Sequence, residues 1–165
     1  MNYQEKIRRI NFVLCSVFLL ALPTRSQTLS WARQIGGTLN DEGYAVAVDA
    51  SGNVYTTGYF NGTVDFDPGP GTANLTSNGA EDIFITKMNA SGNIVWAKNM
   101  GGATAEYGRS IAVDASGNIY CTGSFTGTGD FDPGPSTYNL TSAGSSDIFI
   151  CKLSSSGDLL WAQRY

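Results

Sequence analysis

The sequence predicts an all-β protein that contains two copies of one four-stranded antiparallel sheet, and three observations support this. A shift of 65 residues aligns residues 31–95 with residues 96–160 without a gap, and 37 of the 65 aligned positions are identical. Within each copy, apolar residues alternate with small or polar ones, which is typical of half-buried strands. Short turns with the letters SGN or SGD join these alternating segments. A third copy begins at residue 161.

The first 26 residues have the layout of a secretory signal peptide. Residues 1–9 are net positive, and residues 10–22 form an apolar run that is short for a membrane span. Thr24 and Ser26 are small residues before a predicted cleavage near Gln27. We therefore expect an exported protein, secreted or held at the cell surface, that has no membrane contact after cleavage. A retained membrane anchor is the alternative interpretation.

The charge of the remaining chain excludes some partners. Residues 27–165 contain six basic and thirteen acidic residues, a net charge of −7, and the whole chain has no histidine. Without a basic patch, binding to nucleic acid lacks its main electrostatic contribution. Without histidine, the protein lacks the usual general base and the commonest transition-metal ligand.

Four strands are expected in each copy, in the same order. In the first copy they span about 44–49, 53–60, 82–88 and 93–99, and they recur 65 residues later. The turns between them need a residue with positive φ, which the glycine of each SGN or SGD supplies. Asp49 and Asp114 begin two of these turns, where an aspartate caps the backbone amides ahead. Further strands of the fourth type are expected at 29–35 and 159–164.

Repeated four-stranded antiparallel sheets predict the blades of a β-propeller. The segments GYAVAVDASGNVYTTGYF and DIFITKMNASGNIVWAKNMGG resemble the SBBP (seven-bladed β-propeller) repeats of exported bacterial proteins. The insertion DFDPGPGTANLTS resembles the long-repeat variety found in Bacteroidetes-type bacteria. The resemblance covers residues 31–165. It implies a propeller fold and export, and it brings no catalytic residues with it.

Propellers have typically four to eight blades, and this chain accounts for two, over residues 31–95 and 96–160. The opening strand normally completes the last blade of a closed ring. Here the last blade already has its own fourth strand. Two interpretations remain open: the chain is part of a longer propeller, or several two-blade chains complete a ring as a homo-oligomer.

The longest connections all lie on one face of the predicted blades. These are the segments 36–43, 61–81 and 126–146, whereas the SGN and SGD turns lie on the opposite face. Long loops on a rigid scaffold are the usual carriers of binding residues. The long-loop face is therefore the candidate binding face, although its ligand-binding residues are not identified by the sequence.

The motif DFDPGP occurs twice on this face and has two interpretations. Asp65 and Asp67, and their equivalents Asp130 and Asp132, have the D-x-D spacing that lets two carboxylates approach a calcium ion. The longer calcium-loop pattern and a closing glutamate are missing. The other interpretation is a stiff turn in which the aspartates cap backbone amides. Calcium is the only cofactor that the sequence suggests.

Two further sets of residues are interpreted as structural. Trp31, Trp96 and Trp161 occupy the same position in successive copies, where a large aromatic residue usually packs between blades, as do Tyr55 and Tyr120 on the second strand. Cys121 and Cys151 replace two threonines of the first copy on neighbouring strands. In an exported chain, this paired replacement predicts a cross-strand disulfide, and two buried free thiols are the alternative.

No nucleophile–base pair, phosphate loop or histidine–cysteine metal cluster is present in the sequence, so we expect no enzyme. The leading interpretation is an exported scaffold that binds a protein or a cell-surface polysaccharide through its long-loop face. The alternative is a carbohydrate-binding propeller completed by oligomerisation of two-blade chains.

Overall fold

The computed structural model describes residues 29–165, so the predicted signal peptide lies outside the described residues. The described part is built from strands and loops, and none of its segments is helical. No helix in this part is long and apolar enough to cross a membrane. The predicted all-β class is therefore confirmed.

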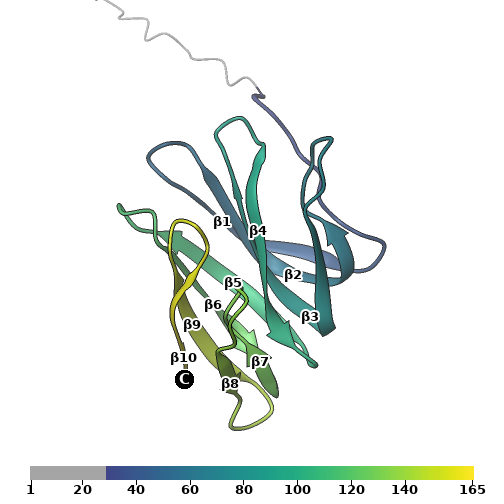
Figure 1. Cartoon of the computed structure of the whole chain (residues 1–165), viewed down its shortest axis with the longest axis vertical. Coiled ribbons are helices and arrows are strands. Elements are labelled where there is room, and N and C mark those ends of the chain that lie inside the picture. Colours follow the sequence, from purple (N-terminus) through teal and green to yellow (C-terminus); the bar gives the residue numbers. More distant parts are fainter. Residues whose placement is uncertain (1–28) are drawn as a thin grey trace, which may run out of the picture.

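The two repeats form two antiparallel sheets, which we call blade 1 and blade 2 (Figure 1). The core of each sheet has four strands whose order in space follows their order in the chain. Blade 1 consists of β1 (Asp41–Val48), β2 (Val54–Asp65), β3 (Asn74–Met88) and β4 (Ile94–Gly102). Blade 2 consists of β5 (Glu106–Val113), β6 (Ile119–Phe125), β9 (Asp147–Leu153) and β10 (Leu159–Arg164). The strands agree with the predicted positions to within a few residues at most ends.

The four short turns have the backbone conformation that the sequence predicted. Their glycines, Gly52, Gly92, Gly117 and Gly157, have φ values between 74° and 84°. Asp49 Oδ1 accepts hydrogen bonds from the amides of Ser51 and Asn53, both at 2.9 Å, and Asp114 repeats this pattern. The aspartate and the glycine therefore fix each turn together, as expected.

The long insertion differs from the prediction because much of it is a hairpin. In blade 1, β2 continues to Asp65 and β3 starts at Asn74, so both strands extend into the predicted loop. In blade 2 the same residues form β7 (Thr128–Asp130) and β8 (Asn139–Thr141). The β-favouring threonines explain this, since the hydroxyls of Thr63 and Thr76 lie 2.8 Å apart across the hairpin.

The expected strand at 29–35 is wrong, because the structure assigns no strand before Asp41. A strand needs a hydrogen-bonded neighbour, and the printed strand pairs include none for this segment. Its fixed points are side chains instead: Trp31 Nε1 donates to the carbonyl of Ala90 at 3.0 Å, and Arg33 Nε donates to that of Gly92 at 3.0 Å.

The main core lies between the two blades. One face of blade 1, with the buried side chains of Tyr55, Ile83 and Ile85, packs on a face of blade 2 that contains Ile111 and Cys121. Elements β1, β2 and β3 all contact β5 across this junction. Apolar burial on this scale is the dominant favourable term in folding, so the two repeats stabilise each other.

The aromatic residues confirm part of the packing prediction. Tyr55 is fully buried, and Trp96 packs against the core and donates from Nε1 to the carbonyl of Ser155 in blade 2 at 3.3 Å. Trp161, in the same position of blade 2, is exposed. Its exposure follows from the absence of a packed blade beyond blade 2 in the described structure.

Candidate functional site

A polar cavity of about 250 Å³ lies where the two blades meet on the long-loop side. We call this side, from which the connections 36–43, 61–81 and 126–146 project, the long-loop edge. Amide and carboxylate side chains supply most of the polar groups around the cavity. Its lining consists of Thr76, Asn78, Asn99, Met100, Gly101, Asp130, Asp132, Pro133 and Gly134.

Strand pairing between the blades places these groups together. Thr76 and Asn78 come from β3, and Asn99 comes from β4, all in blade 1. Asp130 ends β7 in the insertion of blade 2, and β7 pairs with β4 through Gly101 and Asp130. This pairing brings the second DFDPGP loop against blade 1, so that Asp130 and Asp132 line the cavity.

The aspartates of the DFDPGP loops cap backbone amides. Asp130 Oδ1 accepts from the amides of Asp132 at 2.9 Å and Tyr138 at 2.8 Å. Asp132 Oδ1 accepts from the amide of Gly134 at 2.8 Å. These contacts support the turn interpretation.

The same caps recur in blade 1. Asp65 accepts from the amides of Asp67 at 2.9 Å and Ala73 at 2.8 Å. Asp67 accepts from the amide of Gly69 at 2.7 Å. The hydrogen bond from Ala73, followed by that from Asp67, lowers the pKa of Asp65 below its ordinary value.

A calcium site in these loops stays a prediction. Calcium takes six to eight oxygen ligands, and each loop provides two aspartates that each already use one oxygen as a cap. Within residues 29–165, no three His, Cys, Asp or Glu side chains gather as a metal site. Further oxygens would have to come from backbone carbonyls, water or a partner.

Two buried carboxyl groups lie beside the cavity, at the junction of the blades. Asp82 at the start of the apolar part of β3 and Glu106 at the start of β5 are both fully buried. A Cβ atom built on Gly101 would lie 2.5 Å from Asp82 Oδ1 and 2.8 Å from Glu106 Oε2. The two oxygens therefore face the same glycine, across a space that holds no side chain.

The hydrogen bonds of this pair are unevenly distributed. Asp82 Oδ2 accepts three, from the backbone and side-chain amides of Asn78 at 3.2 Å each and from Asn99 Nδ2 at 3.1 Å. Glu106 accepts from the amide of Gly102 at 2.8 Å and the hydroxyl of Thr104 at 2.9 Å. Asp82 Oδ1 is buried and has no partner.

Burial shifts the pKa of both groups upward. It raises the pKa of Asp82 to about 6, against the opposing effect of the asparagine hydrogen bonds. It also raises the pKa of Glu106 to about 7, with a smaller contribution from the negative charge of Asp82. Burial disfavours the charged form of a carboxyl group, and two such groups side by side disfavour double ionisation.

The sequence analysis did not single out this pair. A signal was present, since each copy has an acidic residue where an apolar strand starts: Asp41 and Glu106 on the first strand, and Asp82 and Asp147 on the third. What the repeat pattern does not reveal is that the third strand of one blade meets the first strand of the next.

The two cysteines lie opposite each other on β6 and β9. Cys121 and Cys151 are partners in the strand register, both are buried, and both are free thiols in the structure. The hydroxyl of Thr57 in blade 1 lies 3.5 Å from Cys121 Sγ across the blade junction. The position is structural, and the disulfide between the two thiols stays a prediction.

Acidic residues are concentrated toward the long-loop edge. Ten of the thirteen acidic residues after the leader lie in or beside its connections, and three lie in the short turns. These ten residues are Asp41, Glu42, Asp65, Asp67, Glu81, Asp82, Glu106, Asp130, Asp132 and Asp147. The long-loop edge is therefore an anionic surface around a polar cavity.

The comparison with protein families now decides what the blades are. The model of the SBBP family, described as a beta-propeller repeat, matches residues 30–64 and 95–132. The two repeats are SBBP β-propeller repeats. The matched segments begin at corresponding places in the two copies and include the first two strands of each blade.

Two curated proteins are similar to this chain. An uncharacterized WD repeat-containing protein of Acanthamoeba polyphaga mimivirus, L264, is 32% identical over 110 residues, which is 58% of this chain and 8% of the relative. The regulatory protein FlaEY of Caulobacter vibrioides is 27% identical over 95 residues, 58% of this chain and 10% of the relative. The chain spans about a tenth of the length of these relatives or less. The WD-repeat relative supports the propeller architecture.

Proposed function

We propose that this protein is an exported, non-catalytic interaction scaffold that binds its partner at the long-loop edge. The observation that carries the proposal is the polar cavity between the blades, with Asn78, Asn99, Asp130 and Asp132 in its wall. The SBBP repeats supply a rigid frame, and the leader pattern of residues 1–26 supports export. A cavity lined by acceptors and carboxylates suits a partner that presents hydrogen-bond donors and positive charge.

A basic segment of another protein is the partner class that this surface fits best. The anionic edge attracts such a segment over about the Debye length, and the cavity offers carboxylates to a lysine or arginine side chain. Of the six basic residues after the leader, Arg164 is paired with Asp147 at 3.2 Å, and Arg109 stacks on the rings of Tyr44 and Tyr107. Neither neutralises Asp130 or Asp132 at the cavity through a printed ion pair.

Binding of a synthetic lysine-rich peptide, measured by isothermal titration, tests the proposal, with a glutamate-rich peptide of equal length beside it. The double variant Asp130→Asn/Asp132→Asn keeps an oxygen for each amide cap and removes both charges. We expect it to weaken binding about tenfold, and we expect added salt to weaken the wild type. The control is Asp158→Asn, which removes one charge from a short turn on the opposite edge.

Equal binding of the two peptides, or equal weakening by the control, would overturn the proposed site. The second candidate function is carbohydrate binding, which the amide and carboxylate lining also favours because these groups pair with sugar hydroxyls. A glycan array distinguishes the two: hits that disappear in the Asp130→Asn/Asp132→Asn variant favour a lectin, and a blank array favours the protein scaffold.

A further inference from the structure

The contact between the two blades defines an interface with two different halves. On the blade 1 side it presents Tyr55, Ile83 and Ile85, which we call the donor face of a blade. On the blade 2 side it presents Ile111, Cys121 and the residues around them, which we call the acceptor face. Every repeat carries both faces, one on each side of its sheet, because residues alternate across a strand.

Each blade therefore has one covered face and one open face. The acceptor face of blade 1 is open: Val46 is 64% exposed, whereas its equivalent Ile111 in blade 2 is 8% exposed. The donor face of blade 2 is open as well: Ile148 is 55% exposed, whereas its equivalent Ile83 is fully buried. The two open surfaces are the two halves of the interface that already exists inside the chain.

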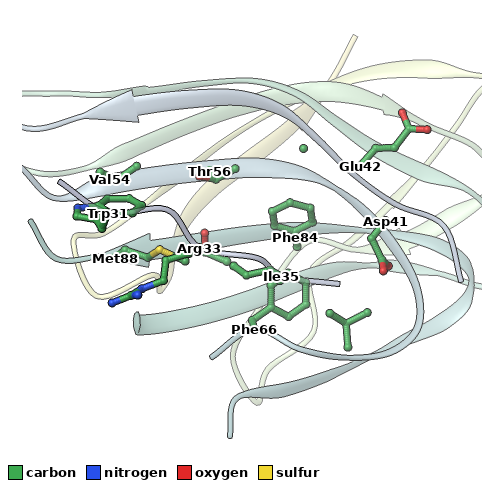
Figure 2. Close-up of a pocket in the computed structure, with 13 residues that line it drawn as sticks. Trp31, Arg33, Ile35, Asp41, Glu42, Val54, Thr56, Phe66, Phe84 and Met88 are labelled. Carbon is green, nitrogen blue, oxygen red and sulfur yellow. The ribbon is translucent and has the colours of Figure 1, made fainter. Parts of the chain in front are cut away.

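The open acceptor face of blade 1 also has a cavity of about 270 Å³ with a mainly apolar wall (Figure 2). Thr56, Phe84 and Met88 of blade 1 line it, together with Trp31 and Ile35 of the segment before β1. The equivalents of the three blade 1 residues, Cys121, Phe149 and Leu153, are fully buried under the neighbouring blade. The hydroxyl of Thr86, also in the cavity wall, is buried without a hydrogen-bond partner.

The segment that contains Trp31 occupies the place of a neighbouring fourth strand. Trp31 Nε1 donates to the carbonyl of Ala90 in blade 1, just as Trp96 of β4 donates to Ser155 in blade 2. The two donor–acceptor pairs are equivalent, since each member is shifted by 65 residues. The segment thus marks where the outer strand of an additional blade would lie.

We propose that a second copy of this chain packs the donor face of its blade 2 on the acceptor face of blade 1. The continuity with the existing blade junction supports this occupant, because the incoming surface has the same repeat sequence as the one that forms that junction. Trp161 of the incoming copy would donate to Ala90 in place of Trp31, so the segment 29–35 is displaced. The contact is head-to-tail and leaves one open face at each end, which can continue into a ring.

Two single variants test the proposal by sedimentation analysis of the full chain after the leader. Val46→Asp places a charge on the acceptor face, and Ile148→Asp places one on the donor face. Both side chains are exposed in a single copy, so the fold of the monomer tolerates the change. We expect wild type to associate with increasing concentration, and each variant alone to require at least about tenfold more protein for association.

An equimolar mixture of the two variants gives the decisive result. Val46→Asp keeps an intact donor face and Ile148→Asp keeps an intact acceptor face, so the mixture should form a one-to-one heterodimer and nothing larger. The matched control is Val95→Asp. Val95 and its equivalent Leu160 are each 52% exposed, although different faces of their blades are covered, so this position lies outside both faces.

Trp31→Ala tests the displaced segment. Loss of the hydrogen bond to Ala90 should strengthen association, because the incoming Trp161 then meets less competition. Weaker association in this variant would show that the segment is part of the interface and contradict its displacement. A wild type that stays monomeric at all concentrations, or a variant mixture that does not pair, would overturn the proposal and leave these faces to a different protein.

Discussion

The replacement Asp82→Asn provides a sharp test of the buried carboxyl pair. Asp82 Oδ2 already accepts three hydrogen bonds, which the oxygen of an asparagine can keep. The amide group of the asparagine then takes the place of Oδ1, which has no partner, and faces Glu106. The variant therefore exchanges a pair of buried acids for a neutral donor beside a carboxylate.

The raised pKa of Asp82 sets the size of the effect. It rises from its ordinary value of 3.8 to about 6, and each tenfold change in proton affinity corresponds to about 1.4 kcal/mol. Holding Asp82 ionised above its folded pKa thus costs the folded state about 3 kcal/mol. Water in the adjoining cavity reduces this cost, so we expect Asp82→Asn to raise the free energy of unfolding by about 2 kcal/mol near pH 8.

The sign of the pH dependence follows from the same shift. Because the pKa is higher in the folded state, the folded protein binds more protons than the unfolded chain between about pH 4 and pH 7. The stability of the wild type is therefore highest at the acidic end of this window and falls as the pH rises through it. In Asp82→Asn the fall should be smaller, with Glu106 alone responsible for the remainder.

Urea unfolding followed by tryptophan fluorescence, near pH 5 and near pH 8, measures both quantities. The matched control is Asp158→Asn in an exposed short turn, which should leave the pH dependence unchanged. An equal pH dependence in wild type and Asp82→Asn, or a loss of stability in the variant near pH 8, would refute this reasoning.

Three further predictions concern the turns, the cysteines and the aspartate loops. Gly117→Ala should lower the free energy of unfolding by about 1 kcal/mol, because φ is 80° there, whereas Gly144→Ala, with open space around it, should change it little; calorimetry compares the two. If Cys121 and Cys151 form the predicted disulfide, thiol titration of the unfolded, non-reduced protein will find no free thiol, and two thiols would contradict it. Asp132→Ala should lower the stability by about 1 kcal/mol through loss of the cap on Gly134. A rise in melting temperature with Ca²⁺ that this variant lacks would support calcium binding, and no rise would leave the aspartates as caps.

Local patterns in the sequence were sufficient to predict most of the fold. Strands with alternating residues and turns with a capping aspartate and a glycine depend on neighbouring residues, so the eight blade strands and the four positive φ values could be expected in advance. The extension of β2 and β3 into the insertion was missed because proline and glycine in DFDPGP obscure the strand-forming residues on either side.

The features that were not predicted depend on contacts between distant residues. The opening segment 29–35 has the letters of a fourth strand, and only the absence of a neighbouring strand prevents it from pairing. The cavity and the pair Asp82 and Glu106 arise where β4 of one repeat meets the insertion and first strand of the next. A linear repeat does not show which residues face each other across that junction.

Hydrogen exchange of the whole protein with the lysine-rich peptide tests the central claim, binding at the long-loop edge, most directly. The account predicts slower exchange in the segments around residues 76–78, 99–102 and 130–138, which surround the cavity, and unchanged exchange in the turns at 49–53 and 114–118. Slower exchange confined to those short turns, or none anywhere while the peptide is bound, would contradict it.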